Sequence, residues 1–514
     1  MLTRIPFKLT IILGVLLLVS CEKDLPTYLE FQTYSYSGID ENGGTWKPIL
    51  IDQPENVEID IAANSSDASY QTELADLKEN MSKMTAADEE AIQYWGNNPV
   101  IRWNEIALEL IAKYNLIPGP NDDGSYTLPS PGEPDGPPAF PFAHPPYASR
   151  ALAYLSVAQF DALITAWHYK YTYNRKSPYQ QDASIPYAYE PTTIPSYPSE
   201  GAVLARVSRK ILTAMFPLEA DHLLELEAAH LKSLSQTGGY VNSDLTAGLS
   251  IGDQIAEAAL RRAATDGMKK AQTSKAVSDS IKLAAFNRFG WQWDNLELPA
   301  RPVGLTPLFG QVKMWNVERV EDTRPVAPPA IGSELYLKDV KILKDHARNM
   351  TEEKRRIANF WQDGLGTYTP PGHWNRFANE FIVKYKMNPL RSARTLAYLN
   401  MAIMDAGISC WDAKYYYHYP RPIQTIAGFK TIAGTPNFPS YTSGHSVFSA
   451  AGAEVLAYIF PEEASLVKGW AEEAAISRVY GGIHWTFDAE VGTTQGIEVA
   501  KYTLYRAAAD GAER

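Results

Sequence analysis

The 514-residue chain has little cysteine, and its acidic residues outnumber its basic ones. Because the only cysteines are Cys21 and Cys410, the fold cannot depend on a framework of disulfides. The formal net charge of -12 argues against a general nucleic-acid-binding surface, since such surfaces neutralise phosphates with an excess of Lys and Arg. Any anion site must therefore be a local pocket.

Long hydrophobic runs are also missing after the first twenty residues, so no later segment is apolar enough to span a membrane. The one such run, Leu9 to Val19, follows Arg4 and Lys8 and is typical of a secretion signal. It ends in "LVSC" at 18–21, which resembles the bacterial lipobox, whose cysteine is acylated after cleavage; the alternative is an ordinary signal peptide with an incidental cysteine. We therefore expect an exported protein, periplasmic or on the cell surface, whose only membrane contact is a lipid anchor on Cys21.

Alternating apolar and polar positions, which are typical of strands, are scarce, whereas helical periodicity is widespread. Leu152, Leu155, Phe160, Leu163 and Trp167, for example, recur near the 3.6-residue period. Amphipathic runs predict further helices at 202–216, 218–233, 251–264, 446–459, 462–479 and 493–509. The sequence therefore predicts an all-α protein built from two antiparallel helical bundles packed together.

The chain contains an internal repeat with a constant spacing of 244 residues. "PSYPSEGAVLARVS" at 195–208 resembles "PSYTSGHSVFSAAG" at 439–452, and the segment 150–171 matches 394–415 at 12 of 22 positions. Upstream, "RWNEIALELIAKY" resembles "HWNRFANEFIVKY" at a spacing of 271, because the first copy carries a longer Pro- and Gly-rich loop between Pro118 and Tyr147. A register of this length predicts a tandem duplication.

The repeat divides the chain into five expected segments. They are a signal at 1–21, a tether and irregular lead-in at 22–75, a first, degenerate bundle at 76–284, an irregular connector at 285–340 and a second bundle at 341–514.

The second copy concentrates cationic and imidazole groups in three short segments. These groups are Lys414 and Arg421, then His445 after Ser443 and Gly444, then Arg478 and His484, with Asp488 following. A tetrahedral oxyanion such as phosphate or vanadate needs several cations and directed donors. Three cations from separate segments, together with the backbone N–H groups and hydroxyl at a helix start, meet that need. We therefore predict an anion site in the second bundle.

The spacing of these segments resembles the signature shared by type 2 phosphatidic acid phosphatases (the PAP2 superfamily), bacterial class A acid phosphatases and vanadium-dependent haloperoxidases. The matching pattern is Lys, six residues, Arg-Pro; then Ser-Gly-His; then Ser-Arg, five residues, His, three residues, Asp. The chain departs from it at Thr442, where the usual pattern has Pro, and this difference bears on the rigidity of the loop. From about residue 90 onward the repeated bundles are similar to the haloperoxidase branch.

The resemblance implies a role for each site residue. Lys414, Arg421, Ser443, Gly444 and Arg478 would bind the phosphate or vanadate. His484 would attack phosphorus in a phosphatase, or bind vanadium through a ring nitrogen in a haloperoxidase. Asp488 can fix the tautomer of His484 if the segment between them is helical. His445 would act as general acid or base, protonating a leaving oxygen or a bound peroxide.

The first copy serves as an internal control for this site. At the matching positions it keeps Lys170, Pro178, Ser199, Ser233 and Asp244. It replaces the others: Ser177 for Arg421, Leu234 for Arg478, Gly201 for His445 and Tyr240 for His484. We expect the first bundle to have kept the scaffold and lost the anion site. Asp405 is matched by Asp161, which favours a structural role for both.

Residues outside the signature favour a haloperoxidase over a phosphatase. Trp411 and Phe438 resemble aromatic positions on the halide side of haloperoxidase pockets, and Phe at the second position resembles the chloroperoxidase type, where bromoperoxidases tend to carry His. Trp167 matches Trp411, so Trp411 has a structural alternative, whereas Ile194 matches Phe438 and is not aromatic. Two neighbours, Tyr417 and His418, are candidate rim residues.

The favoured hypothesis is thus a vanadium-dependent haloperoxidase-like lipoprotein, with vanadate as cofactor and hydrogen peroxide and halide as substrates. The alternative is an acid phosphatase that hydrolyses phosphate esters without a cofactor, with His484 as nucleophile. A third hypothesis, an anion-binding lipoprotein with a vestigial site, is disfavoured by the intact set of Lys414, Arg421, His445 and His484.

Overall fold

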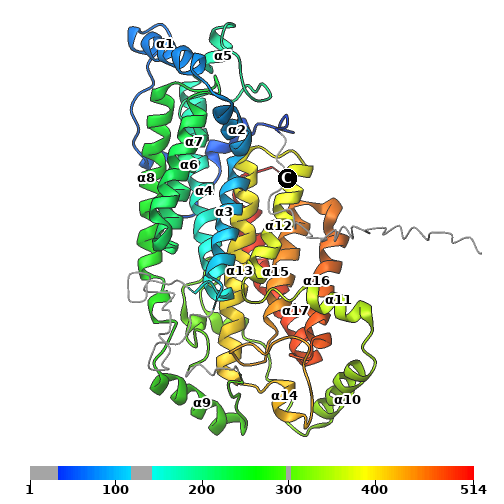
Figure 1. Ribbon diagram of the computed structural model, residues 1–514. Helices are drawn as coiled ribbons and strands as arrows, with labels where there is room; N and C mark the ends of the chain where they lie inside the picture. Colours follow the sequence, from blue (N-terminus) through cyan, green and yellow to red (C-terminus); the bar gives the residue numbers. More distant parts are fainter. Residues whose placement is uncertain (1–32, 117–141, 297–302, 514) are drawn as a thin grey trace, which may run out of the picture. The chain divides into compact units, whose positions relative to one another are not determined.

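The regular elements in residues 33–116, 142–296 and 303–513, the part of the chain that the computed structural model describes, are all helices (Figure 1). The all-α class is therefore confirmed. The Ala-rich runs of the sequence form helices whose starts are fixed by local chemistry. Ser199 and Ser443 each cap a helix by accepting a hydrogen bond from the backbone N–H three residues on.

The first half holds eight helices within its described residues. They are α1 (Ala68–Ser82), α2 (Ala86–Trp95), α3 (Pro99–Tyr114), α4 (Pro145–Tyr173), α5 (Pro178–Gln181), α6 (Glu200–Met215), α7 (Ala220–Leu234) and α8 (Asn242–Thr265). The second half holds α10 (Glu334–Arg348), α11 (Glu352–Phe360), α12 (Thr369–Lys384), α13 (Pro389–Tyr417), α14 (Pro422–Thr425), α15 (Gly444–Ile459), α16 (Ala464–Tyr480) and α17 (Thr486–Ala507). The helix α9 (Lys275–Phe289) lies between them.

The helices of the two halves keep the spacing read from the sequence. From α4 to α8, every helix starts 244 residues before its counterpart from α13 to α17. The helix ends agree as well, because α4 and α13 both stop at a residue in the left-handed conformation, Asn174 and His418. Shared ancestry of the halves stays a prediction, but their helices repeat in register.

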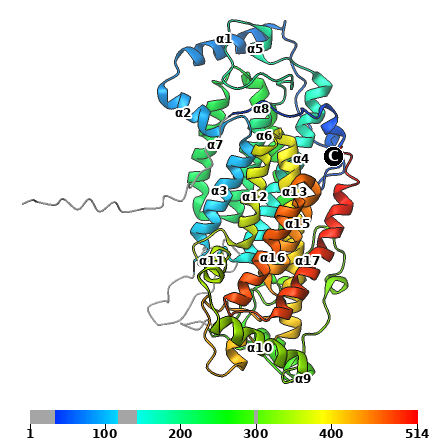
Figure 2. The ribbon, with the colours of Figure 1, turned by 90° about the vertical axis from the view of Figure 1, so that its right-hand side faces the viewer.

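Four long helices, two from each half, form the centre of the molecule. In Figures 1 and 2, α3 and α4 lie beside α12 and α13, and each of the four contacts the other three. The helices α6 to α8 pack outside α4, and α15 to α17 pack outside α13. The two halves therefore share one core, and residues 32–514 form one compact unit.

Buried amides join the halves at this centre. Asn104 on α3 donates to Asn375 on α12 at 2.9 Å, and Asn375 donates to Asn400 on α13 at 2.7 Å. Asn400 in turn donates to Ser156 on α4 at 2.9 Å. Asn104 and Asn375 are matched residues at the spacing of 271, and Ser156 and Asn400 are matched at 244, so equivalent positions of the two halves meet.

The expected segment boundaries differ from the helix boundaries in detail. The helix α1 begins at Ala68, within the expected lead-in, while α9 and α10 extend into the two ends of the expected connector. The expected loop between Pro118 and Tyr147 lies mostly outside the described residues, and its described end already belongs to α4. Cys21 and the signal segment also lie outside them. None of the described helices has the length and apolar character that a bilayer crossing requires.

Candidate active site

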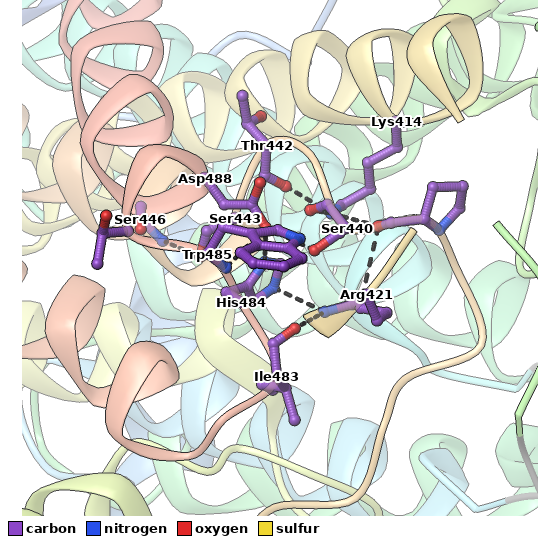
Figure 3. A network of polar contacts seen from close by, with 12 residues as sticks. Lys414, Arg421, Ser440, Thr442, Ser443, Ser446, Ile483, His484, Trp485 and Asp488 are labelled. Carbon is purple, nitrogen blue, oxygen red and sulfur yellow. Dashed lines mark hydrogen bonds and ion pairs between the residues drawn. The ribbon is translucent and has the colours of Figure 1, made fainter. Parts of the chain in front are cut away.

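The predicted anion site is built where three loops of the second half meet at one end of its bundle, near α14 in Figure 1. Lys414 lies in the last turn of α13, and Arg421 is the residue before α14. Ser443, Gly444 and His445 lie at the start of α15. Arg478 lies in the last turn of α16, and His484 lies in the turn between α16 and α17. Figure 3 shows Lys414, Arg421, Ser443 and His484 converging.

Lys414 is fully buried, and it holds the loop that precedes α15. Its Nζ donates to the carbonyl oxygens of Pro439 and Ser440, both at 2.9 Å, and of Thr442 at 2.5 Å. Burial lowers the pKa of Lys414 to about 7, because the charged form loses its hydration. The charge of Lys414 therefore depends on a nearby anion at neutral pH.

His484 lies between a guanidinium and a carboxylate. Arg421 Nη1 lies 2.9 Å from His484 Nε2, and Asp488 Oδ2 lies 2.8 Å from His484 Nδ1 (Figure 3). A guanidinium can only donate, so Nε2 carries the lone pair and Nδ1 carries the proton that bonds to Asp488. Burial and then the charges of Arg421 and Lys414 hold the pKa of His484 well below its usual value. The neutral ring thus presents Nε2 as a ligand or nucleophile.

Asp488 acts on His484 from the first turn of α17, although His484 itself lies in the loop before that helix. The sequence analysis expected this contact if the segment between them is helical; it forms although His484 lies outside the helix, because Asp488 is directed back onto the loop. Its Oδ2 also accepts from Ser440 Oγ at 2.5 Å and from the backbone N–H of Trp485 at 3.2 Å. Burial raises the pKa of this carboxyl to about 7.

Arg421 and Arg478 are also buried, and burial lowers the pKa of each to about 10, so both stay charged at neutral pH. Arg421 donates to the carbonyls of Phe438 and Ile483, and Arg478 donates to Ser477 and Ala358. Both charges act on His484 by lowering its pKa. The charges of Lys414, Arg421 and Arg478 therefore all act on one imidazole.

His445, the other predicted acid–base residue, lies on the first turn of α15. Its side chain is 16% exposed, and its Nε2 has no hydrogen-bond partner among the described residues. Burial and the charge of Arg478 hold its pKa well below the usual value. Gly444 precedes it, and Ser443 caps the helix with its hydroxyl, so the N-terminus of α15 faces the same site.

The aromatic side of the site consists of Trp411 and Phe438, whose rings lie 4.9 Å apart. Trp411 Nε1 donates to the carbonyl of Leu305 at 3.1 Å, as Trp167 Nε1 donates to that of Ile39 at 3.0 Å. This hydrogen bond is common to both halves and is structural. The tilted ring contact with Phe438 belongs to the second half alone, and the Phe438 ring also lies 5.0 Å from Lys414 Nζ.

The matching place in the first half is filled by the protein's own carboxylate. Lys170 binds the carbonyl of Pro195 as Lys414 binds that of Pro439, but it also forms a 2.7 Å ion pair with Glu200. Tyr240, at the position of His484, donates to the same carboxylate at 2.8 Å. Glu200 matches Gly444. The first half therefore supplies its own anion, the Glu200 carboxylate. The second half has Gly444 at that position, which leaves its cations without this internal partner.

Several functional neighbours were not predicted. Ser440 holds Asp488, and Thr442 donates its hydroxyl to Gln495 at 2.6 Å. This hydrogen bond fixes the loop at Thr442, the position where the usual pattern has Pro. The first half has Pro198 and Ile251 at these two places, so their joint change was visible in the repeat. Asp363 and His373, which lie beside His445, were also missed.

The ambiguous residues have structural contacts. Asp405 accepts the backbone N–H groups of Trp315 and Asn316, as Asp161 accepts those of Ile49 and Leu50. Burial raises the pKa of each of these two carboxyls to about 7. Two candidate rim residues are buried: Tyr417 donates to the carbonyl of Pro325, and His418 accepts from the backbone of Trp293.

Comparisons with known proteins agree with this geometry. Residues 394–510 match the family model of the PAP2 superfamily. Vanadium chloroperoxidase of Curvularia inaequalis is 26% identical over 130 residues, which cover 18% of this chain and 21% of that protein. The chain thus matches about a fifth of the length of this curated relative.

The fold is shared with solved vanadium-dependent haloperoxidases. A bacterial vanadium-dependent iodoperoxidase superposes with a TM-score of 0.58 at 22% identity, covering 79% of this chain and 96% of that one. A holo-type bacterial vanadium-dependent chloroperoxidase gives 0.51 at 13% identity, covering 75% and 97%. At these identities the likeness establishes the fold alone.

The donor set fits a tetrahedral oxyanion. Lys414, Arg421 and Arg478 supply positive charge, the N-terminus of α15 supplies backbone donors, and His484 supplies a lone pair on Nε2. Within the described residues no cluster of three or more His, Cys, Asp or Glu side chains could hold a bare metal cation. Charge and donors are therefore arranged for an anion, and the Glu200 carboxylate in the first half occupies the corresponding place.

Proposed function

We propose that this protein is a vanadium-dependent haloperoxidase-like enzyme that oxidises halide with hydrogen peroxide. The observation that carries the proposal is the pairing of a cationic oxyanion site with a lone-pair imidazole at His484, in a fold shared with haloperoxidases. Vanadate, when bound, would supply a Lewis acid that activates hydrogen peroxide toward halide.

The residues divide the work of binding between charge and direction. Lys414, Arg421 and Arg478 would neutralise the oxyanion, and the backbone at Gly444 would direct N–H groups toward its oxygens. His484 would contribute Nε2 as the ligand, with Asp488 keeping the proton on Nδ1. Arg421, which now donates to Nε2, would turn its N–H toward the oxyanion.

His445 would carry the proton transfers. Its Nε2 has no partner among the described residues, and its low pKa keeps the ring neutral, so it can accept a proton from an incoming hydroperoxide. The charge of Arg478 also disfavours a lasting positive charge on His445, so the ring returns to its neutral form.

The side chains of Trp411 and Phe438 support the halide role. Their rings form an apolar wall of the site next to the cations. This wall would displace water from a bound halide, while Lys414 and Arg421 would compensate the charge of the halide. Phe438 has no aromatic counterpart in the first half, which retains the scaffold without the cationic set.

An acid phosphatase is the second candidate, since the same lone pair on His484 could attack phosphorus and the same cations could bind a phosphate ester. In this case His445 would protonate the leaving oxygen, and no cofactor would be needed. A non-catalytic anion-binding protein is the third. We propose in each case that the protein is exported and tethered to a bacterial membrane by a lipid on Cys21.

Two assays on purified protein lacking residues 1–21 separate these candidates. The first measures bromination that depends on halide, peroxide and added vanadate, and the second measures hydrolysis of a phosphate ester without vanadate. Halogenation is the expected result. Ester hydrolysis that vanadate inhibits, with no halogenation, would replace the first proposal by the second.

His484→Ala should abolish whichever activity appears, because it removes the only proposed ligand or nucleophile with a lone pair held between Arg421 and Asp488. The matched control is Tyr240→Phe at the equivalent place in the first half, which should leave activity unchanged and affect stability only. Full activity of the His484 variant would show that the site lies elsewhere.

A further inference from the structure

A buried carboxylate and imidazole lie beside the proposed active site. Asp363 follows α11 and His373 lies in the first turns of α12, and their side chains are 6% and 7% exposed. His373 Nδ1 lies 3.1 and 3.2 Å from the two carboxylate oxygens of Asp363. Neither residue belongs to the anion-binding set, so the pair needs another explanation.

The pair is directed at His445. Asp363 Oδ2 lies 4.0 Å from His445 Nε2, the nitrogen that has no hydrogen-bond partner among the described residues. The backbone of Trp361 and Gln362 acts to raise the pKa of His445, against the larger effect of burial. The segment 361–363 therefore lies beside the ring and carries the carboxylate that faces it.

Aromatic side chains hold the ring of His373 in place. It stacks on Trp361 with a centroid distance of 4.7 Å, and the rings of Phe377, Phe360 and Tyr368 lie at 4.9, 5.1 and 5.9 Å. Because these rings pack around the imidazole, it keeps its Nδ1 toward Asp363. Gln362 and Leu365, which lie in the same loop as Asp363, are exposed.

The repeat separates this pair from the common scaffold. The residue that matches His373 at the spacing of 271 is Arg102, which binds Glu105 at 2.8 Å and the carbonyl of Tyr94. The residue that matches His445 is Gly201. The imidazole at 373 is therefore present only in the half that has the imidazole at 445.

Other charged and titratable groups pack against the pair and share its field. They are Arg478 and Glu473 on α16, His445 on α15, and Arg376, Glu380 and the neighbouring Tyr368 on and before α12. The charge of Asp363 acts to raise the pKa of Arg478, which belongs to the proposed anion site.

We propose that His373 is a positioning residue that fixes Asp363, which in turn orients His445 and accepts its proton. His373 Nδ1–H donates to the Asp363 carboxylate, because an ionised carboxylate can only accept. A small rotation of protonated His445 would bring its Nε2–H to Asp363 Oδ2: the N–H bond breaks and a carboxyl O–H forms, and the proton returns to Nε2 when His445 next acts as an acid. The inference rests on the site of the proposed function but not on which reaction occurs there.

The test compares His373→Gln and Asp363→Asn with Arg102→Gln, the matched change in the first half. The two site variants should each lower kcat by about 10- to 100-fold with little change in KM. Each should also flatten one limb of the kcat pH profile, and it should be the same limb in both variants. The double variant should be no slower than either single one, because both act in one step. Arg102→Gln should change none of these.

Two further measurements distinguish a role of His373 in this proton transfer from a role in packing alone. In His373→Ala, added imidazole should restore turnover at least about tenfold, since the aromatic box leaves room for a free ring. Without reference to turnover, calorimetry in two buffers should show fewer protons taken up with sulfate in His373→Gln than in the wild type.

Unchanged pH profiles and unchanged proton uptake in folded His373→Gln would overturn the proposal. If neither halogenation nor hydrolysis is found but the proton uptake changes as expected, the proposed reaction fails while the link between His373 and the site stands.

Discussion

The protonation of His484 depends on two side chains from different loops. Arg421 donates to Nε2 and Asp488 accepts from Nδ1, so the position of the ring proton is set by neighbours that the three-residue spacing alone does not fix. Asp488 is itself held by Ser440. The chemistry of this residue is therefore a property of the whole contact set.

Asp488→Asn tests that dependence. An amide that turns its N–H₂ toward Nδ1 moves the ring proton to Nε2 and removes the lone pair from the site, so affinity for vanadate, which would use that lone pair, should fall by about 10- to 100-fold. Titration calorimetry measures the loss. Asp244→Asn, at the matching place where the carboxylate binds Arg175 and the backbone of Val241, should leave the affinity unchanged. Equal losses would show that the change acts through folding.

The pH dependence of anion binding follows from Lys414. Its pKa of about 7 means that it is charged below pH 7 and neutral above it, and a bound anion raises that pKa again. Asp488 gains negative charge over the same range, which acts in the same direction. Affinity for sulfate, which does not titrate here, should fall as pH rises from 7 to 9, by up to about tenfold per unit. A flat profile in the wild type would contradict this, and Lys414→Met isolates the lysine's share.

At the scale of single elements, the same helix start serves two purposes. The N-termini of α6 and α15 have the same serine cap, but α6 begins with Glu200 and α15 with Gly444. The glutamate makes an ion pair with Lys170 that is internal to the first half. The residue at this helix start is thus one of the differences that leave the cations of the second half without an internal counter-charge of this kind.

Glu200→Gln should destabilise the protein without affecting its reaction. The variant keeps the shape of the side chain but leaves Lys170 buried without a counter-charge, at a cost of about 3–5 kcal/mol. Urea denaturation measures the free energy of unfolding, and the halogenation assay measures activity. A loss of activity in folded protein, with stability unchanged, would assign the first half a part in the reaction.

For the whole molecule, the amides between the halves determine how it unfolds. Asn104, Asn375, Asn400 and Ser156 are fully buried and form one chain of hydrogen bonds across α3, α12, α13 and α4. The apolar contacts of the same four helices surround it. The two halves are therefore expected to lose their structure together.

Asn375→Leu should lower the stability of both halves in one step. It leaves the amides of Asn104 and Asn400 without their partner, at about 1–3 kcal/mol for each buried group. Scanning calorimetry should show a single transition at a lower Tm, and Asn80→Leu on the exposed face of α1 should shift it little. Two separate transitions in the variant would show that the halves are independent.

The proposed site could be predicted because its residue types are tied to sequence spacing. Lys414 and Arg421 lie in one short segment and Arg478 and His484 in another, and the helices between them fix their order and spacing. The replacements in the first half could also be predicted, since each cation or imidazole that is lost is visible at its matching position. Asp363 and His373 could not, because they reach His445 from the loop after α11 and from α12.

The sequence by itself determined the helices and their repeat at 244 residues, because periodicity and capping act within a few residues along the chain, and it named the residues of the proposed anion site. Only the tertiary structure decided the rest. Burial set the charge of Lys414, the loop before α17 brought Asp488 onto His484, and Glu200 filled the first half's site. Each depends on loss of water and on contacts between distant segments, and these exist only once the bundles have packed.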